Sequence, residues 1–161
     1  MPWARWFVDG RINLTVACVD RWARGGAGAR PALIAESETG AVRMLTYAEL
    51  AAEVDRVAAA LTAEGFGHGD AAGVFLPMVP EAVIAAYAIA KLGRIYLPIF
   101  SGLAPSAVAA RLQDAGATVL FTADGTWRRG RQGLMKPVAD EAVAECPTVQ
   151  GLWCSRTWAP R

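Results

Sequence analysis

The sequence predicts an α/β domain built on parallel βαβ units. Between residues 71 and 123, short apolar segments alternate with helical ones in the order strand, helix, strand, helix, strand. Each helical segment begins on a proline and is followed by a glycine, which is the usual placement of these residues at helix ends. Such alternation is typical of parallel sheets. A length of 161 residues suits one domain of this kind better than two.

The first 30 residues predict an extension that precedes the α/β region. Within it, residues 13–26 predict a short helix that ends at a pair of glycines. Leu14, Cys18 and Trp22 recur at a spacing of four, so we expect them to form its apolar face.

A small hairpin and a capped helix follow. Residues 32–37 and 42–47 flank a Thr-Gly turn, which favours two short antiparallel strands. Thr46 and Glu49 have the spacing of a capping box, and so predict a helix start. Gly65 predicts the end of that helix. Its expected apolar face consists of Leu50, Val54, Val57, Ala58 and Leu61.

The remaining elements alternate regularly. Strands are predicted at residues 71–77, 94–100 and 118–123, and helices at 80–92 and 105–114. The first and third strands are almost wholly apolar, as expected for strands buried on both faces.

The composition excludes several classes of function. The formal net charge is +1, which provides no overall field to recruit nucleic acid or an anionic membrane. The longest uncharged apolar run, residues 82–90, is far shorter than the roughly 18 residues of a spanning helix. Charged residues interrupt the N-terminus, which argues against a signal peptide. The three cysteines lack a CxxC spacing and there is one histidine, His68, so we expect free thiols, a cytoplasmic protein and no metal site.

Two loops at predicted strand ends are candidates for binding an anion. Ligands of open parallel sheets gather at the carboxyl ends of the strands. Residues 99–105 lead from a strand into a helix N-terminus, whose free N–H groups favour negative charge. Residues 122–131 lead from another strand into three arginines.

The arginines are Arg128, Arg129 and Arg131. If this segment is helical, Arg128 and Arg131 share a face, and their guanidinium groups are suited to gripping one phosphate. The alternative is a solvated basic loop, because charge runs are usually solvated. Trp127 either stacks on a base such as adenine or anchors the loop.

Several motifs resemble, in order, the N-terminal part of the AMP-forming acetyl-CoA synthetases and short-chain acyl-CoA synthetases of the adenylate-forming superfamily. The resemblance runs from about Trp6 to Val149. The segments that carry it are WFVDGRINLTVACVDRW, LTYAELAAEVDRVAAALTAEGFGHGDAAGVFLPMVPEAVIAAYAIAKLG, IFSGLAPSAVAARLQDAGATVLFTADGTWRRGR and MKPVADEAV.

The resemblance implies an acid–CoA ligase. In that family a carboxylate and ATP give an acyl-adenylate and pyrophosphate, and the thiol of CoA then displaces AMP, with Mg²⁺ in the complete enzyme. It also implies that the RRGR segment, Arg128 to Arg131 with Gly130, holds the 3'-phosphorylated nucleotide end of CoA. Arg129 stands where relatives often carry a smaller residue. Gly102 lies in FSGL, which matches an FGGF-type loop near the same nucleotide but departs from it at Ser101 and Leu103.

Other family motifs have no counterpart in these 161 residues. They are the phosphate-gripping loop with its Pro-Lys-Gly, the later ATP-binding motifs and the catalytic lysine. We therefore expect no catalytic residue and no Mg²⁺ ligand here, and an incomplete N-terminal domain that is inactive alone. It divides into the extension (1–30), the α/β region (31–149) and an atypical tail (150–161), where relatives have a valine-rich strand. The alternative is a standalone CoA- or nucleotide-binding module, or one subunit of a split synthetase, with the missing remainder as its partner.

Overall fold

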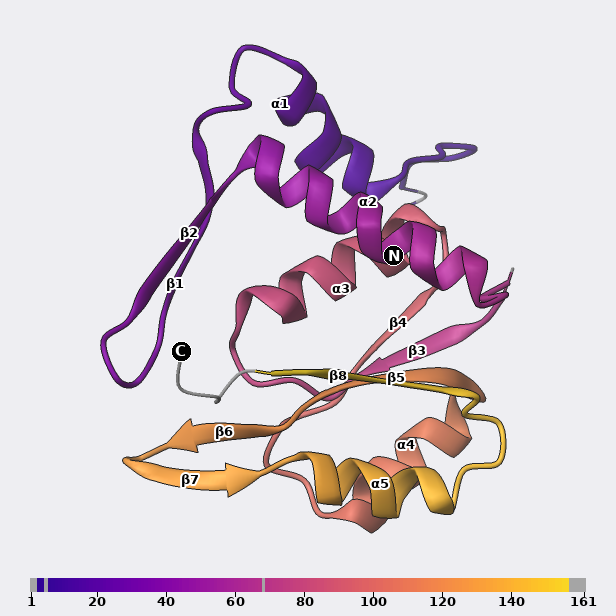
Figure 1. Ribbon diagram of the computed structural model, residues 1–161. Coiled ribbons are helices and arrows are strands. Elements are labelled where there is room, and N and C mark those ends of the chain that lie inside the picture. The colour runs from indigo at the N-terminus through magenta and orange to yellow at the C-terminus, as the bar shows by residue number, and fades with distance from the viewer. Residues whose placement is uncertain (1–2, 5, 68, 157–161) are drawn as a thin grey trace.

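A computed structural model describes residues 3–4, 6–67 and 69–156 (Figure 1). The predicted tail residues 157–161 and His68 lie outside the described residues. The elements in chain order are η1 (Val16–Asp20), α1 (Arg21–Arg24), β1 (Pro31–Glu36), β2 (Val42–Thr46), α2 (Tyr47–Ala63), β3 (Ala71–Val74), α3 (Pro80–Lys91), β4 (Ile95–Pro98), α4 (Pro105–Asp114), β5 (Ala117–Ala123), β6 (Gly125–Arg128), β7 (Arg131–Leu134), α5 (Lys136–Ala144) and β8 (Gly151–Ser155).

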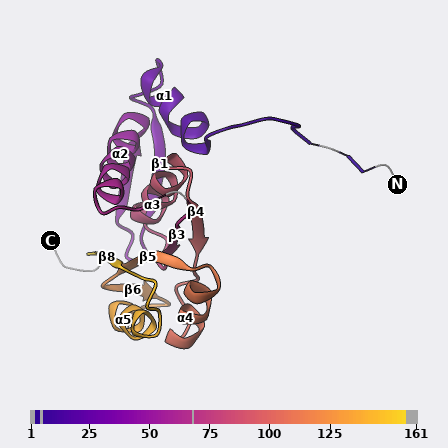
Figure 2. The ribbon, with the colours of Figure 1, turned by 90° about the vertical axis from the view of Figure 1, so that its right-hand side faces the viewer.

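A four-stranded parallel sheet in the order β4-β3-β5-β8 forms the centre of the fold. The chain steps from β3 to β4 in one direction, then crosses back to β5 and continues to β8. This reversal places α2 and α3 on one face of the sheet and α4 and α5 on the other, as Figures 1 and 2 show. The predicted α/β class with a small N-terminal hairpin is confirmed.

The central strands bury both faces. In β5, Val119 and Phe121 pack into the cluster under α2 and α3, whereas Leu120 packs into the cluster under α4 and α5. In β3, Gly73 faces the second of these clusters so closely that an added Cβ would lie 2.7 Å from Leu112. The sheet is therefore a packed core between two helical layers.

The helix predicted from the capping box is α2. The Thr46 hydroxyl accepts a hydrogen bond from the Glu49 backbone, and the Glu49 carboxylate accepts one from the Thr46 backbone. Of the predicted apolar face, Val57 is half-buried and the other four members are buried. The helix ends before Gly65, which adopts a φ of +82°.

The N-terminal helix exists, but the predicted apolar face is wrong. Leu14 and Trp22 are exposed, and Cys18 is half-buried, whereas Thr15, Val19 and Asp20 are buried. The reason is that the buried face includes two polar residues, Thr15 and Asp20, so the spacing of apolar residues does not identify it.

Hydrogen bonds and an ion pair attach this segment to the C-terminal end of α3. The Asn13 amide donates to the carbonyl oxygens of Ala90 and Lys91, and the Thr15 hydroxyl donates to that of Tyr87. The buried Asp20 carboxylate lies 3.0 Å from the Lys91 ammonium group. Residues 6–12, which precede Asn13, extend away from the domain in Figure 2.

Two antiparallel hairpins stand beside the sheet. The predicted hairpin is β1-β2, and a second, β6-β7, contains the arginines. The helical geometry considered for the arginine segment is therefore not adopted. Arg129 and Gly130 form its two-residue turn with φ values of 53° and 71°, as in a type I′ turn. An Arg-Gly pair is not one of the usual signals for this turn, which are Asn-Gly and Asp-Gly.

The start of the predicted tail joins the sheet. Gly151–Ser155 form β8, which pairs in parallel with β5 along its whole length. Trp153 packs on Phe121 with ring centroids 5.3 Å apart. Within the described residues, no helix is long and apolar enough to cross a membrane.

Candidate functional site

A cleft lies where β3, β4 and β5 end. The strand order reverses between β3 and β5, and in open α/β sheets ligands bind outside the carboxyl ends of the strands at such a point. The loops that follow these strands supply one part of its lining, and the tip of the β1-β2 hairpin supplies another. The cleft encloses about 320 Å³ and is lined by Glu36, Ser37, Glu38, Pro77, Met78, Val79, Phe100, Ser101, Gly125, Thr126, Trp127 and Arg128.

Arg128 and Arg131 lie opposite each other at the end of the β6-β7 hairpin. Directly paired residues of antiparallel strands project their side chains to the same face. The hairpin thus makes Arg128 and Arg131 cross-strand neighbours, through strand pairing instead of the helical spacing of three that the sequence suggested. Both side chains are exposed.

Gly102 and Arg128 also meet. The Arg128 guanidinium lies over the Phe100 ring, with its carbon 5.3 Å from the ring centroid. A Cβ added to Gly102 would lie 2.6 Å from a terminal nitrogen of Arg128 and 3.0 Å from the Phe100 ring. Glycine at position 102 therefore leaves the space that this guanidinium occupies.

Arg129 and Gly130 contribute to the site through their backbone N–H groups. Their backbone N–H groups donate to the two carboxylate oxygens of Glu38, over 3.1 Å and 3.3 Å. No ion pair formed within the described residues involves the guanidinium groups of Arg128, Arg129 or Arg131. The hairpin therefore presents positive charge beside the cleft. Such a surface is suited to a phosphate group.

Glu38 was not among the residues predicted for the site. It lies 91 residues before Arg129, and no local pattern links a hairpin tip to a turn so far along the chain. Trp127 lines the cleft and is 40% exposed. This position leaves its ring within reach of a ligand. Phe100, 62% exposed, is a second aromatic ring beside the same cleft.

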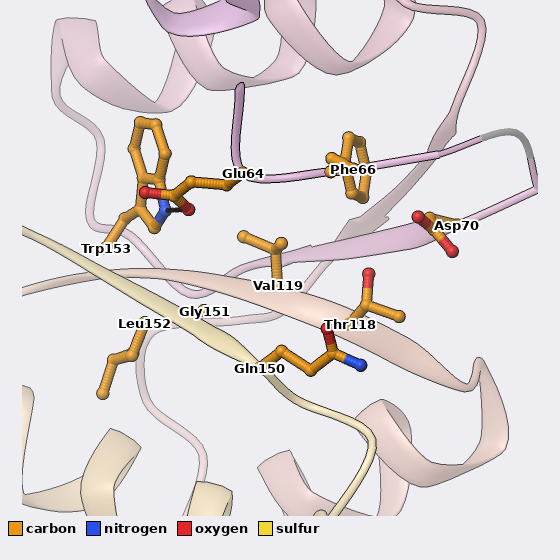
Figure 3. A pocket seen from close by; sticks show the side chains of 10 residues that line it. Glu64, Phe66, Asp70, Thr118, Val119, Gln150, Gly151, Leu152 and Trp153 are labelled. Carbon is orange, nitrogen blue, oxygen red and sulfur yellow. Dashed lines mark hydrogen bonds between the residues drawn. The ribbon is translucent and has the colours of Figure 1, made fainter. Parts of the chain in front are cut away.

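A larger cavity of about 850 Å³ lies at the opposite end of the sheet, beside the start of β5 and β8 (Figure 3). Its charged lining residues are Glu64 and Asp70, and it contains none of the predicted site residues. The Glu64 carboxylate accepts a hydrogen bond of 2.9 Å from the Trp153 ring. The smaller cleft is the candidate functional site, because it lies at the carboxyl ends of the strands and is lined by Arg128.

The described residues bring together no group of three or more His, Cys, Asp or Glu side chains that could hold a metal ion. The site as described is therefore an arginine-bearing, partly aromatic cleft. Its chemistry is suited to recognising an anionic ligand with a flat ring.

The family model described as AMP-binding enzyme matches residues 19–159. Acetyl-coenzyme A synthetase of Streptomyces avermitilis is 46% identical over 143 residues, which cover 89% of this chain and 22% of that protein. The corresponding protein of Gemmatimonas aurantiaca is 42% identical over 151 residues, covering 94% and 23%.

A solved structure, acetoacetyl-CoA synthetase from Streptomyces lividans, has the same arrangement of elements. It superposes with a TM-score of 0.79 at 32% identity, and the match covers 86% of this chain and 22% of that one. The chain thus spans about a fifth of the length of these relatives.

Proposed function

Because the chain belongs to the AMP-binding enzyme family, we propose that its arginine-bearing cleft binds the nucleotide end of coenzyme A in an acyl-CoA-forming ligase. Arg128 and Arg131 contact the 3'-phosphate, and Gly102 gives Arg128 the room to do so. Arg129 and Gly130 form the turn that places Arg128 opposite Arg131.

The observation that carries this proposal is the convergence of Gly102, Phe100 and Arg128. Gly102 and Phe100 lie in the loop after β4, whereas Arg128 is the last residue of β6. The Arg128 guanidinium lies over the Phe100 ring, and Arg128 is exposed. An arginine held in this way loses less conformational freedom when it binds phosphate. The neighbouring Trp127 supplies a second ring on which the adenine can stack.

We further propose that the chain is part of a ligase that converts a carboxylate, ATP and CoA to acyl-CoA, AMP and pyrophosphate. Acetate or another short-chain acid is the acyl donor, in keeping with the names of the relatives. Mg²⁺ assists ATP in this chemistry, but the described residues do not form a site that fits it. The cysteines of the structure are free thiols, which supports a cytoplasmic setting.

Binding of CoA and dephospho-CoA to the 161-residue chain tests the proposal directly by calorimetry. Dephospho-CoA lacks only the 3'-phosphate, so the ratio of the two affinities isolates that group. Arg128→Ala and Arg131→Ala should each weaken CoA binding about tenfold or more, because each removes a charge-assisted contact worth roughly 1.5–3 kcal/mol. Neither should change dephospho-CoA binding by more than about twofold.

Arg111→Ala is the matched control, since Arg111 is an exposed arginine on α4 whose guanidinium donates to a carbonyl of its own helix. It should leave both affinities unchanged. If the parent chain binds CoA no better than dephospho-CoA, the assignment of the 3'-phosphate to this hairpin is wrong and the segment is a solvated basic loop.

A further inference from the structure

The turn of the β6-β7 hairpin, formed by Arg129 and Gly130, is joined to the β1-β2 hairpin by one acidic side chain. Glu38 lies in the turn between β1 and β2, and both its carboxylate oxygens accept backbone N–H groups of the other hairpin's turn, at Arg129 and Gly130. The two hairpins are otherwise separate two-stranded sheets. A two-stranded ribbon by itself is marginally stable in water.

The turn that Glu38 contacts is costly to form. Arg129 has a φ of 53°, in the left-handed region that a residue with a Cβ disfavours. Its N–H group and that of Gly130 lie outside the β6-β7 ladder, and the Glu38 carboxylate accepts both. An ionised carboxylate is a strong acceptor for such groups, so the contact offsets the backbone cost.

We propose that Glu38 is a positioning residue, whose carboxylate joins the two hairpin tips and holds Arg128 and Arg131 at the edge of the cleft. Without this link, which we call the brace, the turn loses its hydrogen bonds to the β1-β2 hairpin, and the two guanidinium groups no longer meet a phosphate together. The part of this proposal that concerns ligand rests on the proposed function, whereas the brace itself does not.

Glu38 acts through hydrogen bonds and also carries a charge of the same sign as phosphate. These effects oppose each other, because the bonds order the arginines while the charge repels the ligand. Glu38→Gln and Glu38→Ala remove the same charge, but glutamine keeps the length and one acceptor oxygen. A difference between these two variants therefore reports the side chain and its hydrogen bonds without a contribution from the charge.

The brace is tested without ligand by amide hydrogen exchange, measured by NMR in the 161-residue chain. Glu38→Ala should lower the protection of the Arg129 and Gly130 amides about tenfold, as expected for losing hydrogen bonds to a charged group. Glu38→Gln should lower it less. Glu36→Ala is the matched control: Glu36 lines the same cleft but makes no hydrogen bond to the turn within the described residues, so its protection pattern should equal that of the parent.

The positioning role is tested by affinity. Glu38→Ala should bind CoA several-fold more weakly than Glu38→Gln, while the two variants bind dephospho-CoA alike. Equal protection in Glu38→Ala and the parent overturns the brace, and equal CoA affinities of the two Glu38 variants overturn the positioning role. If the parent itself does not prefer CoA to dephospho-CoA, the proposed function fails, and the exchange result still decides the brace.

Discussion

Replacement of Gly102 by alanine should disturb the site without unfolding the protein. The new Cβ would lie 2.6 Å from a terminal nitrogen of Arg128 and 3.0 Å from the Phe100 ring. An ordinary van der Waals contact is about 3.5 Å, so the guanidinium must move by roughly 1 Å. The group that moves is the end of a long exposed side chain, so we expect a change of less than about 1 kcal/mol in the free energy of unfolding.

The effect on binding should be larger than the effect on stability. The displaced guanidinium loses its place over Phe100, worth about 0.5–1 kcal/mol at an exposed site, and meets the 3'-phosphate in poorer geometry. We expect CoA to bind about three- to tenfold more weakly, which is less than the loss on removing the whole side chain. Dephospho-CoA binding should change little.

Two measurements check this prediction. The Arg128 side-chain N–H resonance, shifted by the Phe100 ring, should move toward its solvent position in Gly102→Ala. Gly133→Ala, in the hairpin that carries Arg128, is the control, because its Cβ would meet Thr126 at an ordinary distance of 3.8 Å. The reasoning is refuted if Gly102→Ala leaves both the resonance and the CoA affinity as they are in the parent and in the control.

Three further substitutions test the fold that supports the site. Gly73→Ala places a Cβ 2.7 Å from a core leucine and should lower the free energy of unfolding by about 1–3 kcal/mol, with a fall in Tm of about 2–4 °C per kcal/mol; an unchanged Tm would contradict it. Burial lowers the pKa of Lys91, but hydrogen bonds to Asp55 and Asp20 outweigh it and raise the pKa above its ordinary 10.5. The contribution of Lys91 to the free energy of unfolding should therefore be complete below about pH 10 and fall as the pH rises through the folded pKa. Chemical denaturation from pH 7 to 11 should show this loss in the parent and not in Lys91→Met. Thr46→Ala removes the α2 cap and should cost about 1 kcal/mol by the same assay, whereas loss of less than a few tenths would show that the cap is dispensable.

Local patterns in the sequence determined most of the elements. Pro80 and Pro105 begin α3 and α4 as predicted, and Gly65 ends α2. These signals act through backbone conformation and neighbouring hydrogen bonds, so a few adjacent residues contain them. The buried face of the N-terminal helix was mispredicted because it includes two polar residues, Thr15 and Asp20, whose partners in α3 lie far along the chain.

The candidate site, too, was predictable from the sequence only in part. The sequence by itself determined which residues carry its charge, Arg128 to Arg131, and that a strand end delivers them. Only the tertiary structure decided that Arg128 lies over Phe100 beside Gly102, and that Glu38 holds the turn. The physical reason is distance along the chain: propensities and caps act over a turn or two, whereas these contacts join loops that only the assembled sheet brings together.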